Sequence, residues 1–275
     1  MRAIILAAGM GRRLGKYTKD GTKCMVTIHG KALIDNAIEA IAFAGIREVT
    51  IVVGYRKERL IEHIGNHYPD LNIEYIANDI YDKTNNIYSL WLARHRLAEG
   101  DTLLLESDLI FDKSLIKEVL DCPEQNVAVI SQFESWMDGT VTLVNEESRI
   151  VNVIEKRYFR WSDISTYYKT VNIYKFSCDF MNRFYLPFLD AYLKAFGNNI
   201  YYEQVIKVLA FFDEVNLFGY KIKGNRWYEI DDPHDLAVAE TLFSPAEQKL
   251  NLMSERYGGY WRFPSLRDFC YLVNP

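Results

Sequence analysis

Cysteine and histidine are scarce in this sequence, which limits the kinds of site that it can form. The four cysteines are widely spaced and include no Cys-x-x-Cys pair. This spacing argues against a zinc ribbon or a disulfide framework and favours free thiols in a reducing compartment. His63 and His67 have the four-residue spacing of a zinc pair on a helix, but glutamate does not follow His63 and no third ligand is evident. We therefore interpret both histidines as surface residues.

The sequence also lacks a long apolar run and an excess of positive charge. No uninterrupted apolar stretch is long enough to span a bilayer, and no signal-peptide pattern precedes the first predicted strand. We therefore expect a cytoplasmic protein. The formal net charge is −5, which argues against nucleic acid as the main partner because nucleic-acid binding requires a basic surface.

What is present is typical of a soluble globular protein. The chain has 275 residues, of which 49% are hydrophobic and 25% charged, enough for one large domain or two small ones. In the first part of the chain short apolar runs alternate with amphipathic segments. Such alternation predicts an α/β fold, with a mostly parallel mixed sheet between helices and ligands bound at the carboxyl ends of the strands. Strands are predicted at residues 3–6, 49–53, 73–77 and 103–105, and helices at residues 33–44, 58–66 and 86–98.

After residue 127 the periodicity changes, because several predicted strands follow one another with little helix between them. This pattern predicts a small antiparallel extension of the sheet, which we expect to form part of a ligand pocket. The strands are predicted at residues 127–132, 141–144, 150–155, 171–176 and 215–222, and further helices at residues 180–196, 202–212 and 234–243.

The stretch from Ile4 to Val26 is the most informative part of the chain. A short apolar run leads into Gly9 and Gly11, where the backbone can turn sharply and approach a ligand. Cationic side chains follow, and a strand that opens into a glycine loop rich in cations is physically a phosphate cradle. The spacing excludes both the dinucleotide-binding and the P-loop patterns. The cations are Arg12, Arg13, Lys16, Lys19 and Lys23.

This stretch resembles the signature L-A-A-G-x-G-x-R-L…P-K of sugar-phosphate and choline-phosphate nucleotidyltransferases. Thr22 stands where the family usually has proline. The resemblance implies a Rossmann-like nucleotidyltransferase fold over residues 1–245. It also implies that Leu6, Ala8, Gly9, Gly11, Arg13 and Lys23 bind the nucleotide. The matching residues are Leu6, Ala7, Ala8, Gly9, Gly11, Arg13, Leu14 and Lys23.

Nucleotidyl transfer requires a divalent ion, and we expect Mg²⁺, which prefers carboxylate oxygens. Asp108 follows the apolar strand in LLLESDLIF, where the family usually carries an aspartate that binds the metal. Asp231, in WYEIDDPHDL, resembles the second family ligand, although Asp232 is adjacent. Neighbouring side chains on an extended chain point to opposite sides, so only one of the two can face the metal, and the resemblance favours Asp231.

Arg13 and Lys23 are the expected catalytic cations, together with the two aspartates. Arginine offers a planar fork to phosphate oxygens, and lysine offers a compact charge near the reacting α-phosphate. Cys24 lies beside Lys23, which would lower the pKa of its thiol, but no histidine motif supports a nucleophilic role.

The segment from Asn78 to Ala93 resembles the corresponding part of bacterial phosphocholine cytidylyltransferases. This resemblance favours cytosine as the base and CTP as the nucleotide. It implies that four residues of the segment bind the nucleotide, namely Asn78, Asn85, Asn86 and Ser89.

Recognition of the acceptor is the least explicit part of the sequence. A quaternary ammonium is best held by an aromatic cage, whereas a primary ammonium donates hydrogen bonds and suits a carboxylate. Lys156 and Lys169 are candidates to bind the phosphonate or phosphate of the acceptor. The YKTVNIYKFS stretch resembles the 2-aminoethylphosphonate cytidylyltransferase branch more than the phosphocholine branch. Further candidates for the acceptor pocket are Trp136, Asp138 and Glu203, with Tyr201 and Tyr202 beside them.

The last segment, residues 246–275, contains the apolar and aromatic run YGGYWRFPSLRDFCYLVNP. It resembles the junction to a pyridoxal-phosphate aminotransferase in bifunctional relatives. The alternative is that it packs on its own domain.

These observations predict a magnesium-dependent cytidylyltransferase that joins CMP to 2-aminoethylphosphonate, a step of phosphonate biosynthesis, and releases pyrophosphate. Its partners would be CTP and a small zwitterionic phosphonate or phosphate ester, and a homo-oligomer is compatible with the sequence. Phosphocholine cytidylyltransferase is the first alternative. A nucleotide-binding module without turnover is the second, although retention of Arg13, Lys23, Asp108 and Asp231 argues against it.

Overall fold

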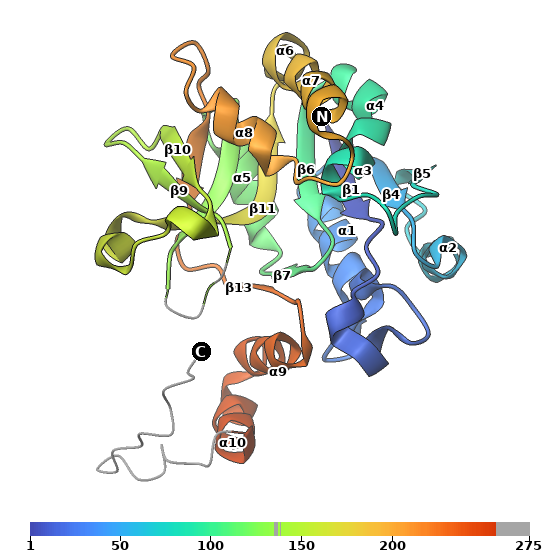
Figure 1. Cartoon of the computed structure of the whole chain (residues 1–275). Helices are drawn as coiled ribbons and strands as arrows, with labels where there is room; N and C mark the ends of the chain where they lie inside the picture. Colours follow the sequence, from blue (N-terminus) through green and yellow to red (C-terminus); the bar gives the residue numbers. More distant parts are fainter. Residues whose placement is uncertain (135–136, 138, 257–275) are drawn as a thin grey trace.

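The computed structural model describes residues 1–134, 137 and 139–256, so that Trp136, Asp138 and residues 257–275 lie outside the described residues. The main sheet contains nine strands in the path β10-β9-β11-β6-β1-β4-β5, with β8 paired to β11 and β12 paired to β8. Helices cover both faces of this sheet (Figure 1). The predicted α/β class with a mostly parallel mixed sheet is confirmed.

The first half of the sheet is parallel. Strands β1, β4, β5 and β6 run in the same direction, so their carboxyl ends share one edge, as the alternating sequence predicts. Leu6 near the end of β1 lies between Val52 of β4 and Glu106 of β6. The bounds are β1 (Arg2–Ala7), β4 (Glu48–Val53), β5 (Asn72–Ala77) and β6 (Thr102–Glu106).

The predicted antiparallel extension is also present. Strand β11 (Tyr168–Phe176) runs antiparallel to β6, β8 and β9, and it therefore joins the two halves of the sheet. Its register shifts between Thr170 and Tyr174, and Asn172 in this bulge has a positive φ of 57°. The other strands are β8 (Val127–Gln132), β9 (Val141–Val144), β10 (Ile150–Ile154) and β12 (Phe218–Lys221).

The core has two sides because successive side chains of β1 point to opposite faces. Ala3, Ile5 and Ala7 belong to one buried cluster, and Ile4 and Leu6 to the other. The first cluster is covered by α1 (Leu33–Phe43), α2 (Lys57–Ile64) and α5 (Ser114–Asp121). The second is covered by α3 (Asn86–Leu92), α4 (Arg94–Ala98), α7 (Leu186–Phe196) and α8 (Glu203–Leu209).

A third, smaller buried cluster lies beyond the carboxyl ends of the central strands, where Figure 1 shows β7, β13 and α9. It contains Leu14 from the glycine loop, Ile110 from β7, Tyr228 from β13, Ile230, and Leu236 from α9. We call it the joining cluster, because it packs the start of the chain against a segment more than two hundred residues later. The bounds are β7 (Leu109–Phe111), β13 (Trp227–Glu229) and α9 (Pro233–Leu242).

The glycine loop is less irregular than its sequence suggests. It contains two short 3-10 segments, η1 (Arg12–Thr18) and η2 (Lys23–Met25). A two-stranded ribbon follows, formed by β2 (Thr27–Ile28) and β3 (Lys31–Ala32).

Two predicted helices differ from the structure. The helix predicted at residues 86–98 divides at Ala93, where Arg94 stacks 3.7 Å from the Trp91 ring centroid and donates a hydrogen bond to the Trp91 carbonyl. The helix predicted at residues 180–196 begins earlier, as α6 (Cys178–Phe180), capped by the Ser177 hydroxyl. A π-helical turn, η5 (Met181–Tyr185), then leads into α7.

An additional helix, α10 (Ala246–Arg256), was not predicted. The predicted end of the nucleotidyltransferase domain at residue 245 falls just before this helix and stays a prediction. No helix in the described part of the chain is long and apolar enough to cross a membrane.

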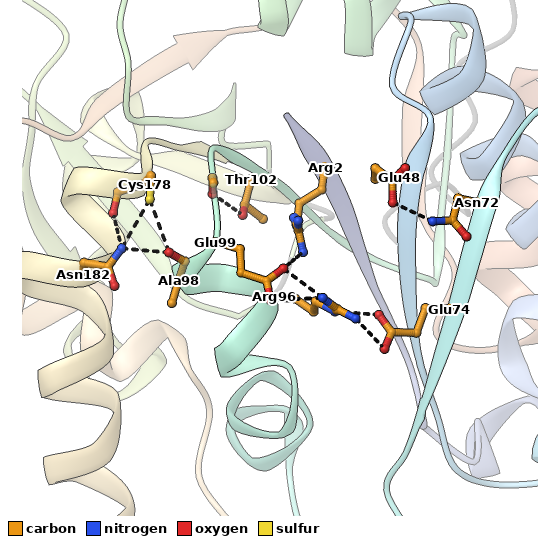
Figure 2. Close-up of polar contacts among 11 residues, drawn as sticks. Arg2, Glu48, Asn72, Glu74, Arg96, Ala98, Glu99, Thr102, Cys178 and Asn182 are labelled. Atoms are coloured by element: carbon orange, nitrogen blue, oxygen red, sulfur yellow. Dashed lines mark hydrogen bonds and ion pairs between the residues drawn. The ribbon is translucent and has the colours of Figure 1, made fainter.

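The opposite, amino edge of the sheet carries a chain of ion pairs, shown in Figure 2. Arg2 at the start of β1 contacts Glu99 at 2.6 Å, and Arg96 lies 2.9 Å from the same carboxylate. The Arg96 guanidinium also contacts Glu74 of β5 at 2.7 Å. We call these four residues the amino-edge cluster. It links three elements through charges that alternate in sign.

Candidate active site

A cavity of about 950 Å³ opens at the carboxyl ends of β1 and β6. It is bounded by the glycine loop, the start of α3, strand β11 and the segment around β13. Most of the residues predicted for nucleotide, metal or acceptor binding line this single cavity. They are Leu6, Ala8, Gly9, Gly11, Arg13, Lys23, Asn78, Asn85, Asn86, Ser89, Asp108, Lys169, Glu203 and Asp231.

The conformation of the glycine loop depends on close contacts that only glycine allows at Gly11 and Gly54. The Ala8 carbonyl accepts a hydrogen bond from the Tyr55 amide at 3.1 Å, and a Cβ at Gly54 would lie only 2.8 Å from that oxygen. Gly11 has a φ of +61°, and a Cβ there would lie 2.8 Å from the Lys23 Cβ. Gly11 therefore allows the loop to turn while the Lys23 side chain passes beside it.

Four charged side chains from three distant segments meet at one end of the cavity. The Lys23 Nζ lies 2.6 Å from Asp108 Oδ2 and 2.7 Å from Asp231 Oδ1. Arg13 Nη2 contacts the same Asp231 oxygen at 2.8 Å. Burial disfavours the Lys23 ammonium, but the charges and hydrogen bonds of the two carboxylates outweigh it and raise the pKa of Lys23 above its usual value. Lys23 is therefore fully charged at neutral pH.

A third carboxylate, Glu229, completes this group. Oxygen atoms of Asp108, Glu229 and Asp231 all lie within 4.8 Å of one another. The sequence analysis missed Glu229, although it precedes Asp231 by two residues on an extended chain and so points to the same side. Lys169 Nζ lies 3.3 Å from Glu229 Oε2, and the Asn172 amide lies 3.4 Å from Oε1. The bulged backbone at Asn172 thus serves to direct a side chain at this carboxylate.

The carboxylate group has the chemistry of a site for a hard divalent cation. Its three members offer only oxygen donors, which suit Mg²⁺. The Oδ1 atom of Asp108 is buried and accepts no hydrogen bond from the described residues, whereas buried polar atoms normally have a partner. The three residues therefore fit such an ion.

Asp231 and its neighbour Asp232 point in different directions. The Asp232 side chain caps α9 by accepting hydrogen bonds from the amides of His234 at 2.7 Å and Asp235 at 3.0 Å. Asp235 in turn accepts from the Asp231 amide at 2.9 Å. Burial opposes ionisation of Asp231, but Lys23 and Arg13 nevertheless hold its pKa below the usual value. Asp231 is therefore the member of the pair that faces Asp108.

The predicted nucleotide-binding residues on the other side of the loop form a hydrogen-bonded group. The buried Asn78 amide donates to Thr84 Oγ1 at 3.0 Å and to Ser89 Oγ at 3.1 Å. Asn85 caps α3, since its side chain accepts from the Asn86 amide at 2.8 Å. These polar side chains are thereby fixed along the cavity wall. Thr84 and Tyr81 also line it and were not predicted.

A second acidic group lies at Asn86. The side-chain Nδ2 of Asn86 donates a hydrogen bond to Glu106 at 3.1 Å and lies 3.5 Å from Glu203. Its side-chain oxygen, Oδ1, accepts a hydrogen bond from the backbone amide of Tyr202. Burial, reinforced by the charge of Asp108, raises the pKa of Glu106 well above its usual value. Burial also raises the pKa of Glu203, to about 7. Glu106 was not predicted, although it precedes Asp108 by two residues.

Other predicted residues lie elsewhere. Lys156 is exposed in the 3-10 turn η3 (Lys156–Tyr158), outside the residues that line the cavity. Tyr201 lines the cavity, whereas Tyr202 is fully buried in the second core cluster. Trp136 and Asp138 lie outside the described residues. Cys24 does not have the lowered pKa that its neighbour suggested, because complete burial raises the pKa of the thiol to about 12.

The profile of the MobA-like NTP transferase domain matches residues 3–156, more than half of the chain. The protein is a member of this family. The nucleotidyltransferase family predicted from the glycine-loop signature is confirmed.

The relatives of this NTP transferase include the CMP-5'-(3-aminopropyl)phosphonate synthase of Streptomyces rubellomurinus. It is 29% identical over 280 residues, an alignment that covers 100% of this chain but only 44% of the relative. Another relative is the 2-aminoethylphosphonate cytidylyltransferase of Lancefieldella rimae, 26% identical over 236 residues, with 86% of this chain and 90% of the relative covered.

Among solved structures, the CTP:phosphocholine cytidylyltransferase of Streptococcus pneumoniae is similar, with a TM-score of 0.76 and 24% identity. The match covers 88% of this chain and 99% of that one. At this identity the similarity supports the fold of the NTP transferase.

Proposed function

We propose that this protein is a cytidylyltransferase that transfers CMP from CTP to 2-aminoethylphosphonate or a closely related aminoalkylphosphonate and releases pyrophosphate. One observation carries the proposal. A single cavity has Lys23 and Arg13 beside three carboxylates at one end, and a partly buried carboxyl pair, Glu106 and Glu203, near Asn86. The first end suits a triphosphate with its metal, and the second suits a cationic acceptor. Two relatives named for aminoalkylphosphonates support the choice of acceptor.

In the proposed reaction, a phosphonate oxygen of the acceptor attacks the α-phosphorus of CTP. One P–O bond forms, the bond between the α-phosphorus and the bridging oxygen breaks, and pyrophosphate leaves with the bonding electrons. Lys23 and Arg13 stabilise the charge that develops on the phosphate oxygens, as fixed cations in a site of low dielectric constant do. No side chain forms a covalent intermediate.

Asp108, Asp231 and Glu229 are the residues that we expect to hold a divalent cation. When bound, such an ion would neutralise phosphate charge and orient the triphosphate. Lys169 contacts Glu229 at 3.3 Å and is largely buried. We therefore propose that Lys169, which lies beside the carboxylate of Glu229, binds the phosphonate group of the acceptor.

At the acceptor end we assign the ammonium to Glu203, assisted by Glu106. The ammonium of an aminoalkylphosphonate offers three hydrogen-bond donors. These two partly buried carboxyls offer hydrogen-bond acceptors, and within the described part of the chain neither forms an ion pair with a cation. Ammonium binding would therefore replace a repulsion between neighbouring acidic groups with an attraction.

Pyrophosphate release tests the proposal directly. The purified protein would be mixed with CTP and Mg²⁺ and, in parallel, with 2-aminoethylphosphonate, 3-aminopropylphosphonate, phosphocholine or no acceptor. We expect rapid release only with the aminoalkylphosphonates. Asp108→Asn is the matched control, because contaminating activities would survive this substitution. Absence of release with every acceptor would favour a nucleotide-binding module without turnover.

The N-methyl series separates the first alternative, phosphocholine. Each methyl group added to the amine of 2-aminoethylphosphonate removes one donor and adds bulk, so kcat/KM should fall from the primary amine to the trimethyl compound. Increasing kcat/KM along the series would instead indicate an aromatic cage, and phosphocholine would then become the preferred acceptor.

A further inference from the structure

The side chain of Asn86 joins three elements at the acceptor end of the cavity. Its Nδ2 donates to Glu106 at the end of β6 at 3.1 Å and lies 3.5 Å from Glu203, the first residue of α8. Its Oδ1 accepts from the Tyr202 amide at 3.0 Å. An asparagine side chain offers two N–H donors and one acceptor oxygen. Both polar atoms of Asn86 therefore act at this end of the cavity.

The connection between α7 and α8 is tied to the start of α3. The Asn198 carbonyl accepts a hydrogen bond from the Asn85 amide at 3.0 Å. The Tyr202 backbone is held on both sides, its amide by Asn86 and its carbonyl by the Tyr185 hydroxyl at 3.2 Å. Because α8 begins at the next residue, these bonds set the position of its first carboxyl group.

A neutral bridge suits two acidic groups that receive a cation. Neighbouring carboxyls repel each other, and hydrogen-bond donors between them offset that repulsion. A lysine or arginine in this place would also neutralise the pair and compete with a cationic ligand. The Asn86 amide adds no charge, and among the described residues no cation forms an ion pair with Glu106 or Glu203. Asn86 thus orders the pair without reducing its attraction for an ammonium.

The proposed acceptor has to span two fixed points. Its phosphonate is assigned to Lys169 on β11 and its ammonium to Glu203 on α8. We propose that Asn86 is a positioning residue that fixes this span and so selects the length of the aminoalkyl chain, an inference that rests on the proposed function for the identity of the acceptor. The sequence resemblance implied that Asn86 binds the nucleotide, whereas here it acts through Glu203.

Two substitutions separate the contacts of Asn86. Asn86→Asp keeps an oxygen for the Tyr202 amide but loses both donors, and Asn86→Leu loses all three contacts at similar size. The matched control is Asp190→Ala, which removes the 2.7 Å bond from Trp91 Nε1 that joins α3 to α7 outside the cavity. Steady-state kinetics would give kcat/KM for 2-aminoethylphosphonate and 3-aminopropylphosphonate and the KM for CTP. Calorimetry would measure binding of both phosphonates to each full-length variant without CTP, and circular dichroism would check folding.

The wild type should distinguish the two chain lengths by roughly tenfold or more in kcat/KM, as one methylene does in a fitted site. Both Asn86 variants should reduce this ratio to less than about threefold, with the KM for CTP changed by no more than about twofold. The control should keep the wild-type ratio. General loosening of the fold would instead weaken CTP and both acceptors alike.

An unchanged length preference in both folded Asn86 variants would overturn the inference and leave the proposed function intact, as would a wild type that uses both lengths equally. A KM for CTP that rises as much as the acceptor KM would return Asn86 to the nucleotide. If the wild type binds the two phosphonates with different affinities, the Asn86 variants lose that difference and no acceptor receives CMP, the positioning role stands and the proposed reaction fails. Binding of neither phosphonate, with no transfer, would overturn both.

Discussion

The two edges of the central sheet treat charge in opposite ways. At the amino edge, Arg2, Glu99, Arg96 and Glu74 alternate in sign, lie near solvent and satisfy one another (Figure 2). At the carboxyl edge, acidic groups crowd together around Lys23 inside a cavity. Strands β1 and β6 begin near the first group and end near the second. The same strands therefore carry one group of charges that stabilises the fold and one whose charged form is costly to bury.

The pKa values express this difference. Hydrogen bonding to Arg96 lowers the pKa of Glu99 below its usual value, so folding favours its charged form. Burial raises the pKa of Glu106, Glu203 and Glu229, so folding opposes theirs. Groups that are costly to bury are the ones poised to bind charged ligands. The contrast predicts that substitutions at the two edges will have opposite effects on stability and activity.

The largest effect should come from the carboxyl edge. Asp108→Asn and Asp231→Asn should each lower kcat by at least about a thousandfold, because each removes a proposed ligand for the divalent cation and an anion beside Lys23. The fold should persist, since asparagine has nearly the same size as aspartate and both side chains remain partly exposed. Rates at saturating Mg²⁺ and circular dichroism would measure the two properties. Near-normal turnover in either variant would show that the altered aspartate does not bind the metal.

Two lysines at the same edge should be separable. Lys23→Ala should lower kcat by about a hundredfold with every acceptor, since we propose that Lys23 stabilises the reacting phosphate. Lys169→Ala should mainly raise the KM for the acceptor, by about tenfold, because it removes one charged contact. Steady-state kinetics with CTP and acceptor varied in turn would test both. An equal loss of CTP affinity in the two variants would mean that Lys169 contacts the nucleotide.

Glu203→Gln should weaken acceptor binding and increase the stability of the folded protein above pH 7. Because the folded protein holds the Glu203 proton more tightly than the unfolded chain, wild-type stability falls as the pH rises from about 4 towards about 7. Glutamine removes that loss, so at pH above 7 the variant should be more stable, on the order of 1–3 kcal/mol. Its acceptor KM should rise. Urea unfolding across this pH range would check the sign, and a variant less stable than wild type at high pH would contradict it.

The smallest effect should come from the amino edge. Glu99→Gln should lower Tm by no more than about 3 °C, because exposed ion pairs contribute little, and should leave kcat unchanged. Its lowered pKa means that the stability supplied by Glu99 is present near neutral pH and is lost as the pH falls through the acidic range. Thermal unfolding at neutral and acidic pH would measure this. A clear loss of activity would show that the two edges communicate.

Sequence patterns predicted the residues that lie in short local motifs. The glycine loop, Lys23 and Asp108 each belong to such a motif, and the structure brings them together with Asp231. Glu229 and Glu106 were missed, although each precedes a predicted aspartate by two residues. On an extended chain, side chains two residues apart point to the same side, so both glutamates could have been predicted to lie beside these aspartates.

The remaining differences depend on tertiary contacts that no local pattern contains. The bulge at Asn172 arises from pairing between three strands. The division of the predicted helix at Ala93 depends on contacts of Arg94 with Trp91. Lys156 lies beyond the end of β10 in a turn that its sequence does not specify, so its distance from the cavity was not predictable.

The joining cluster has a consequence for the order of events during synthesis. Lys23 and Asp231 are separated by 208 residues, and a ribosome makes the chain from its amino end. The glycine loop and Asp108 therefore exist well before β13 and α9 emerge to pack against Leu14. A nascent chain can bury the parallel half of its sheet while its phosphate loop still lacks the opposing carboxylate. We expect catalytic competence to be acquired in one late step, after most of the polypeptide has already folded.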